Sequence, residues 1–598
     1  MSSSESSSSD MDGNDPDYDE SDFSDDDNTE YDYDSEDETD EFSDAETEPV
    51  TEQGWCLMAD PFNDLRPDPL PEYVDDGQAF IKAGVPTFEN ESQAFCAFFD
   101  EQMITQLCMW TNERADEFFR VRVDENNNTS RKVNGILWKN VNQKEMYVFL
   151  SLLMIMGVNK LPRIHMYWSN NAMVGGSRIF SRQVMSRSRF LNILKFLRFG
   201  PLLQVEKGKP KTRIEPYLQL LRHKCQDILE PGRDIAIDES LRLWKGRLQF
   251  KQFIKTKRSR FGIKIYFLCP SDSSFSGYSW AFEVYYGKDS DFNSDDPDAS
   301  DLSKSEQVVV YLMRNLLTVG RHVITDNWYT SLRLALYLLK KNTLLTGTLR
   351  ADRGAPQIMR TETLTKNQAV FARKENVLVM KYLDKKLVHV LSTKSTAGFV
   401  DHTRTYFGNK TVFKKKPSIV EEYNQLMGSV DKADALLEPY SYERKSLAWF
   451  KKLGIHFVFR TLLNSHLIYK KQQTVQYKKD FLDFTIKVAE QLVSDNSEGA
   501  KEIIQDQHVK QSVSKRRKMS GIPVIHGLIK RKPLTGKTRA PRKKCIVCFI
   551  EGTKQGKTIK EARKDTVLHC PGCDELPGLC SIDCYKKWHL RDWQRKYR

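Results

Sequence analysis

Two stretches decide the fold of this chain: DIAIDES at residues 234–240 and RHVITDNWY at residues 321–329. In each, a short run rich in β-branched residues leads into an aspartate, Asp238 in the first and Asp326 in the second. Such runs predict buried strands, and an acid that ends a strand lies at the sheet edge where ligands of α/β proteins collect. A third aspartate, Asp431, lies in MGSVDKAD at residues 427–434, which is compatible with a helix.

Carboxylates that are far apart in sequence and meet at one sheet edge suit a pair of divalent cations about 4 Å apart, the arrangement used for in-line phosphoryl transfer. Their hard oxygen ligands favour Mg²⁺, with Mn²⁺ as the alternative. The ordinary alternative for each of Asp238, Asp326 and Asp431 is a solvated turn residue. Asp434 follows Asp431 by three residues, so the two share a face if the segment is helical.

The chain is strongly asymmetric in charge. Its 598 residues carry a net charge of +10, but residues 1–65 contain 25 Asp or Glu and no Lys or Arg. The remainder holds 91 basic and 56 acidic residues, a balance of +35. A basic body favours a polyanion such as double-stranded DNA as partner; the alternative is a merely solvated surface.

The sequence contains no signal for a membrane or for secretion. No stretch approaches about 18 uninterrupted apolar residues, and no basic segment followed by an apolar run opens the chain. We therefore expect no membrane partner, and no motif indicates a small-molecule substrate. Six of the eleven cysteines lie between Cys545 and Cys584, and in a reducing compartment such clustering indicates metal rather than disulfides.

Changes in composition and periodicity divide the chain into regions. Three strands followed by a helix, a strand and a helix, with an acid ending the first and fourth strands, form the layout of an RNase H-like core. The regions we expect are a disordered acidic head at 1–75, a helical segment at 76–232, the first part of the α/β core at 233–349, a β-rich insertion at 350–417, the final core helix at 418–440, a second helical segment at 441–509, a basic linker at 510–544 and a cysteine-rich module at 545–598.

Basic residues gather in two places. Arg247, Lys257 and Arg258 belong to a cationic connection between the first two predicted strands and are candidate DNA contacts. Residues 510–544 hold 13 Lys or Arg and no acid. Within them, residues 515–518 form a Lys-Arg-Arg-Lys cluster that would serve nuclear import, or plain phosphate affinity. We expect a nuclear protein.

The cysteine module has the spacing of a zinc site. The candidate ligands are Cys545, Cys548, Cys570, Cys573, Cys580, Cys584 and His589. Paired CxxC turns place two thiolates at the radius of tetrahedral Zn²⁺, and a module of this size needs metal to fold. Two zinc ions need eight ligands, so His569 or Asp583 is the eighth, or one ion binds alone. RING and PHD modules share this spacing, so ubiquitin ligation and histone reading stay open as alternatives.

Taken together, these motifs resemble the piggyBac family of DNA transposases over about residues 85–598. The matching pieces are the acids at 238 and 239, the stretch from Gly246 to Lys264, TDNWYTS at 325–331, GSVDKAD at 428–434, and the cysteine module. The resemblance implies a transposase with an RNase H-like core, a β-rich insertion, a C-terminal zinc module that binds transposon ends, and a dimerisation and DNA-binding domain built from both helical segments. It further implies a homodimer that moves DNA between terminal inverted repeats and TTAA target sites.

The resemblance also assigns roles to single residues. It makes Asp238, Asp326 and Asp431 the catalytic acids and Asp434 a fourth acid that supports the metal site. Trp449, beside Arg444 and Lys445, matches an aromatic near the active site that stacks on a displaced base. Cellular proteins derived from such elements exist, so a nuclear DNA- or chromatin-binding protein without transposition activity is the alternative function.

Overall fold

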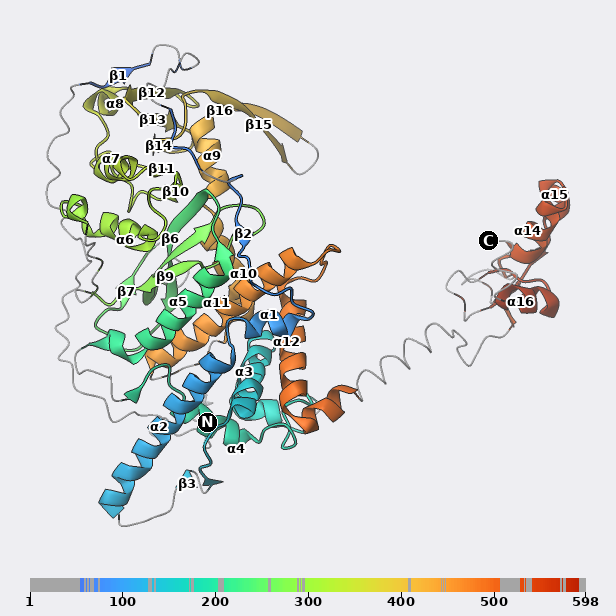
Figure 1. Cartoon of the computed structure of the whole chain (residues 1–598). Coiled ribbons are helices and arrows are strands. Elements are labelled where there is room, and N and C mark those ends of the chain that lie inside the picture. Colours follow the sequence, from blue (N-terminus) through green and yellow to red (C-terminus); the bar gives the residue numbers. More distant parts are fainter. Residues whose placement is uncertain are drawn as a thin grey trace, which may run out of the picture. The chain divides into compact units, whose positions relative to one another are not determined.

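The computed structural model describes residues 54–126, 132–202, 209–255, 260–406, 410–505 and 528–590, with short gaps inside several of these ranges. These residues form two compact units, one within Met1–Lys501 and one within Glu502–Arg598 (Figure 1). Most of the acidic head and residues 515–518 lie outside the described residues, so the expectations placed on them stay predictions.

A ten-stranded mixed sheet forms the centre of the first unit, in the order β1-β12-β13-β14-β11-β10-β6-β8-β7, with β9 paired to β8. Its middle consists of β6 (Asp234–Leu243), β8 (Phe261–Pro270), β10 (His322–Thr325) and β11 (Leu344–Thr348). β10 runs parallel to both β6 and β11, and β8 is antiparallel to β6. β8 is buried nearly throughout, and its sequence is apolar except at Lys264. The four residues of β10 are also all buried.

The chain order of the core agrees with the RNase H-like prediction. After β6 and β8 come β9 (Ala281–Val284), α6 (Lys304–Met313), β10 and α7 (Leu332–Lys340). A capping box at Ser303 and Glu306 begins α6, and the Ser331 side chain caps α7. The fold class predicted from the sequence, an α/β core of this layout, is confirmed.

Helices from both sides of the sheet sequence pack together. α3 packs against α12, and α1 packs against both α11 and α12, which Figure 1 shows as one helical group. Two segments separated by the whole core therefore build one helical region. The helices are α1 (Glu91–Cys96), α2 (Glu101–Asn126), α3 (Gln143–Val158), α4 (Arg187–Phe196) and α5 (Glu215–Ile228) before the sheet, and α11 (Trp449–Gln472) and α12 (Phe481–Asn496) after it.

The predicted β-rich insertion is largely a continuation of the central sheet. β12 (Ala369–Lys374), β13 (Val377–Leu383) and β14 (Leu387–Ser392) form a meander, and β14 pairs with β11. The hairpin of β15 (Phe399–Tyr406) and β16 (Lys410–Pro417) forms a separate two-stranded sheet. Two helices then lead back to the core, α9 (Ser418–Leu426) and α10 (Ser429–Leu437).

The folded part begins earlier than the predicted boundary near residue 75. β1 (Cys56–Leu57) pairs with the edge strand β12, and Asp64, almost fully buried, forms an ion pair with Arg373. An apolar run of four residues, Trp55 to Met58, was too short to separate from the acidic head by composition.

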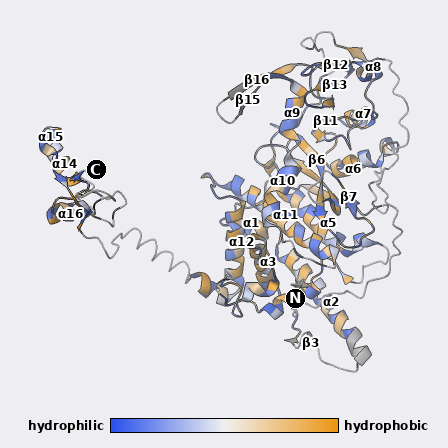
Figure 2. Cartoon of the chain, turned by 180° about the vertical axis from the view of Figure 1, so that it is seen from behind, coloured by the Kyte–Doolittle hydropathy of each residue, from blue (hydrophilic) through white to orange (hydrophobic). Residues whose placement is uncertain are grey.

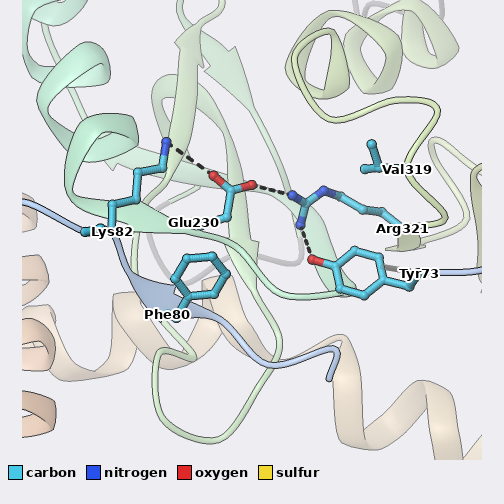
Figure 3. A pocket seen from close by; sticks show the side chains of 7 residues that line it. Tyr73, Phe80, Lys82, Glu230, Val319 and Arg321 are labelled. Atoms are coloured by element: carbon cyan, nitrogen blue, oxygen red, sulfur yellow. Dashed lines mark hydrogen bonds and ion pairs between the residues drawn. The ribbon is translucent and has the colours of Figure 1, made fainter. Parts of the chain in front are cut away.

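The next residues line a cavity of about 400 Å³ against the start of β10 (Figure 3). Arg321 donates to the Tyr73 hydroxyl at 3.1 Å and pairs with Glu230, which Lys82 approaches to 3.2 Å. This ionic chain fixes the entering segment to the core.

The second unit is small and built around its cysteines. Its elements include α14 (Ile546–Lys554), α15 (Ile559–Ala562) and α16 (Ile582–His589), and two short β pairs, β17 (Ile529–Lys530) with β20 (Leu568–His569) and β18 (Lys543–Lys544) with β19 (Asp565–Thr566). Among the described residues of this unit, the fully buried members of the cluster around the cysteines are Val547, Leu579 and Trp588. Such a core is too small to hold the fold through apolar burial alone.

Among the described residues, no helix is both long and apolar enough to cross a membrane. Figure 2 shows hydrophilic and hydrophobic residues mixed along the helices of both units.

Candidate active site and metal centres

Asp238 and Asp326 meet because their strands are parallel neighbours. The last paired residues of the two strands are Ile237 and Thr325, so the aspartates that follow lie side by side at the carboxyl edge. Oxygens of Asp238, Asp326 and Glu239 lie within 4.8 Å of one another. The structure thus brings two of the predicted acids together and adds a third that the sequence analysis had not assigned.

The surroundings of this carboxylate cluster disfavour negative charge. Asp238 is 8% exposed. Burial, together with the charge of Glu239, raises the pKa of Asp326 to about 6. The opposing contributions, from the Trp328 backbone N–H at 3.0 Å and from the Lys264 ammonium, are smaller. Holding buried carboxylates close together costs free energy, and a hard cation bound between them would offset that cost.

Asp431, the third predicted acid, lies on α10. The helix packs against β6 and β8, and Asp431, in its first turn, is exposed. Its carboxylate is not part of the 4.8 Å cluster. Burial first, and then the charges of Asp326, Asp238 and Asp431, raise the pKa of Tyr423 on α9 to about 12. The charges of all three predicted acids thus contribute to the shift of one hydroxyl.

Asp434 does not join the carboxylate cluster. It pairs with Arg460 of α11, a residue that is 1% exposed and whose guanidinium lies 4.0 Å from the centre of the Phe267 ring. Phe267 is the β8 partner of Asp238. Asp434 thus links α10 to α11 through this ion pair.

Removing either partner of this ion pair is expected to lower stability by a different amount. Asp434→Ala is expected to destabilise the protein by about 3 kcal/mol because it leaves the buried Arg460 charge without its partner. Arg460→Met is expected to cost less, because the Asp434 side chain is 34% exposed and water replaces the lost contact. Urea denaturation of the full chain measures both. Equal losses, or the reverse order, would show that the pair does not anchor α10.

The predicted DNA contacts differ in their surroundings. Arg247 is exposed, and Trp449 is half-buried at the start of α11, edge-on to Phe250 with 5.1 Å between ring centres. Arg444 donates to the carbonyl oxygens of Leu161 and Pro162, at 2.6 and 3.2 Å. The remaining candidates, Lys445, Lys257 and Arg258, lie outside the described residues.

The cysteine module forms two ligand groups. The first contains four thiolates, those of Cys545, Cys548, Cys580 and Cys584. Three of the sulfur–sulfur distances, Cys548 to Cys580, Cys548 to Cys584 and Cys580 to Cys584, are 3.5–3.6 Å. Tetrahedral zinc with bonds of about 2.3 Å requires roughly 3.8 Å between sulfurs, so the group fits the ion.

The second group consists of Cys570, Cys573 and His589. The Nε2 atom of His589 lies 3.5 and 3.3 Å from the two sulfurs, and its Nδ1 lies 2.7 Å from the Tyr585 carbonyl oxygen. With its proton on Nδ1, His589 would present the Nε2 lone pair to a metal, which is the usual tautomer of a zinc ligand. The three ligands fit one zinc ion and leave its fourth position to another donor.

The two groups interleave along the chain. The first and third cysteine pairs share one group, and the second pair shares the other with the histidine, which is the cross-braced arrangement. Neither proposed eighth ligand belongs to either group. His569 Nδ1 instead lies 3.0 Å from the Ile529 carbonyl oxygen in the β17–β20 pair, and Asp583 lies in the first turn of α16.

Two family models match the chain. A model described as Transposase IS4 matches residues 90–466, and a model described as a DDE_Tnp_1-like zinc finger matches residues 532–590. The first range contains all four predicted acids, and the second contains all seven candidate zinc ligands.

Individual proteins are similar as well. PiggyBac transposable element-derived protein 3 of Homo sapiens is 23% identical over 459 residues, which are 73% of this chain and 69% of that protein. PiggyBac transposable element-derived protein 2 of Homo sapiens is 24% identical over 350 residues, 56% of this chain and 57% of that protein. A cryo-EM structure of the piggyBac transposase synaptic complex with hairpin DNA aligns with a TM-score of 0.58 at 21% identity, covering 73% of this chain and 87% of that one.

Proposed function

The chain belongs to the piggyBac-type transposase family, and on this premise we propose that it is an active cut-and-paste transposase that excises an element and inserts it at TTAA sites. The observation that carries the proposal is the meeting of Asp238 and Asp326 at the carboxyl edge of the sheet. The helix that bears Asp431, α10, packs against β6 and β8, which supports a place for this third acid in the same site.

Each acid has a distinct part in this proposal. The buried Asp238 is the central ligand, Asp326 binds beside it from the parallel strand, and Asp431 closes the site from α10. Two Mg²⁺ ions held by these carboxylates would clamp the attacking and leaving oxygens of the scissile phosphate. The protein's own contribution is to hold the carboxylates in place: Asp238 and Asp326 through the β6–β10 register, and Asp431 through the Asp434–Arg460 pair.

We propose double-stranded DNA as the partner, recognised by two parts of the chain. The cysteine module, with zinc in its two ligand groups, would read the terminal repeats, because base-edge contacts require a rigid reader. The first unit would bind flanking and target DNA through phosphates, and two copies of the chain would hold the two ends. The structural neighbour, a synaptic complex with hairpin DNA, has the same fold, which supports this assignment.

A second candidate function is a nuclear DNA- or chromatin-binding protein without transposition. The observation that favours it is that the human relatives are named as element-derived proteins. This alternative predicts binding to DNA but no strand cleavage in Mg²⁺ or Mn²⁺.

Excision in cells separates the two candidates. A reporter interrupted by a TTAA-flanked element is expected to be restored by the wild-type chain and not by the chain with Asp238→Asn, Asp326→Asn or Asp431→Asn. Exposed Asp401, on the β15–β16 hairpin, provides the matched control Asp401→Asn. Excision retained in all three variants would refute the assignment of the acids.

The acidic head is expected to compete with DNA for the basic body. Deletion of residues 1–53, which precede the described fold, should increase affinity for random DNA several-fold at about 50 mM salt and change it little at 300 mM, because salt screens both interactions. Fluorescence anisotropy across a salt series measures this. Equal affinities of the two proteins at every salt concentration would make the head a solubilising tail.

Nuclear import is expected to depend on the basic clusters at 515–518 and 530–532. Replacing both with alanine should leave a fluorescent fusion in the cytoplasm, because a transposase must reach chromosomal DNA and these clusters have the composition of an import signal. Microscopy of the fusion tests this, and undiminished nuclear signal would assign import to another segment.

A further inference from the structure

Glu239 is the carboxylate of the active site that neither the predicted catalytic triad nor the supporting acid includes. Its side-chain oxygen lies within 4.8 Å of ligand oxygens of both Asp238 and Asp326, whereas Asp431 is not a member of this group. Consecutive residues of a strand normally point to opposite faces, so a neighbour of Asp238 is not expected to share its site.

The strand register explains the exception. β10 ends at Thr325, opposite Ile237, but β6 continues through Leu243 and is paired there only with β8. Beyond Ile237, residues that follow Asp326 lie beside β6, since Tyr329 contacts Glu239 there. At this point the Asp326 carboxylate lies within 4.8 Å of those of both Asp238 and Glu239.

Tyr329 directs Glu239 into this space. Its hydroxyl donates to Glu239 Oε2 at 3.0 Å, and its ring is fully buried against Tyr266 and Trp328, with ring centres 6.3 and 4.7 Å away. Tyr266 is also the β8 partner of Glu239. A packed aromatic wall thus holds the Glu239 carboxylate through the Tyr329 hydroxyl.

The three carboxylates of the cluster lie close to one another. Lys264 acts on Asp326, and its ammonium lies 3.9 Å from the centre of the Trp328 ring. A divalent cation between the three acids would offset the repulsion of their charges.

We propose that Glu239 is a third carboxylate ligand of the cation held by Asp238 and Asp326, with Tyr329 as its positioning residue. The inference rests on the proposed function for the identity of the ion as Mg²⁺ or Mn²⁺. It goes beyond that function because one ion would have three carboxylate ligands, Asp238, Glu239 and Asp326, whereas the other would have two, Asp238 and Asp431. We therefore expect the protein to bind the two ions with unequal affinities.

Titration of the full zinc-loaded chain with Mn²⁺ alone tests the inference. The EPR signal of unbound Mn²⁺ reports how much is bound, so neither DNA nor an activity assay is needed. The wild type is expected to bind two ions with different affinities. Glu239→Gln, which keeps an acceptor for the Tyr329 hydroxyl, should weaken the tighter site about tenfold or more. Tyr329→Phe should weaken it a few-fold, since the carboxylate remains but loses its orientation. The exposed Glu362 provides the control Glu362→Gln, which should bind as the wild type.

The outcomes separate this inference from the proposed function. If Asp238→Asn loses Mn²⁺ while Glu239→Gln binds as tightly as the wild type or tighter, Glu239 is not a ligand and only this inference fails. If the wild type binds no Mn²⁺, the inference and the metal-dependent function fail together. If Glu239→Gln loses the tighter site and the wild type still cleaves no DNA, the inference stands and the transposase proposal fails.

Discussion

Asn in place of Asp326 is expected to abolish DNA strand cleavage and at the same time to stabilise the magnesium-free protein at neutral pH. Loss of a metal ligand removes several kcal/mol of transition-state stabilisation, about 1,000-fold or more in rate. The pKa of Asp326 in the folded protein is raised to about 6, chiefly by burial and then by Glu239. Its charge therefore opposes folding at neutral pH.

The direction with pH follows from this shift. An acid whose pKa is higher in the folded than in the unfolded state favours folding while it is protonated, and that contribution is lost as the pH rises through about 6. Asp326→Asn should therefore gain about 1–2 kcal/mol at pH 7.5, a figure reduced for the partial exposure of the group. The gain should vanish near pH 4, where Asp326 is protonated.

Urea denaturation without added magnesium at pH 7.5 and pH 4 measures the effect, and a cleavage assay on the same preparations measures the loss of activity. Asp401→Asn, on the exposed hairpin, should change neither. If Asp326→Asn is inactive and also less stable than the wild type at pH 7.5, the Asp326 carboxylate stabilises the fold and its charge does not oppose folding.

Removal of one zinc-binding cysteine is expected to unfold half of the cysteine module and to abolish selective binding to transposon ends. Apparent zinc-binding free energies of about 10–16 kcal/mol exceed what the few apolar residues around the cysteines supply. Cys548→Ser should lower the zinc content from two ions per chain to one, and Cys573→Ser should do the same through the other group. Cys56, an exposed cysteine of β1, provides the control Cys56→Ser with two ions.

Zinc content by elemental analysis and competition binding to repeat and random DNA test this directly. The variants should keep weak, salt-sensitive affinity for any DNA through the first unit, because phosphate contacts carry no sequence information. If Cys548→Ser still prefers its own ends over random DNA, recognition resides outside the module, and a role in histone reading or ubiquitin ligation gains support.

The parts of the fold that depend on local sequence were predictable. Asp238 and Asp326 end short strands whose apolar runs are visible in the sequence, and the parallel pairing that joins them follows from the order of strands and helices. The cysteine spacing likewise predicted zinc-ligand groups, because each CxxC pair forms one local turn. Both features can be recognised from residues that are close together in the sequence.

The parts that depend on register and on distant contacts were not predictable. Glu239 was not assigned to the site because the alternation of a strand is expected to point it away from Asp238. The structure shows the two acids close together where β6 continues past the end of β10. The ion pair of Asp64 with Arg373 joins residues more than 300 positions apart, so the start of the folded region was placed too late. Which cysteine pairs share a metal was equally hidden, since spacing fixes pairs but not their partners.

Strand cleavage by the purified chain tests the central claim most directly. The substrate is a duplex that carries the element's terminal repeat beside TTAA, labelled at its 5′ end, with Mg²⁺ supplied or withheld. The account predicts a nick at the repeat end with Mg²⁺ in the wild type, and none with Asp238→Asn, Asp326→Asn or Asp431→Asn despite undiminished binding to the duplex. Cleavage without a divalent cation, or equal cleavage by all three variants, would contradict it.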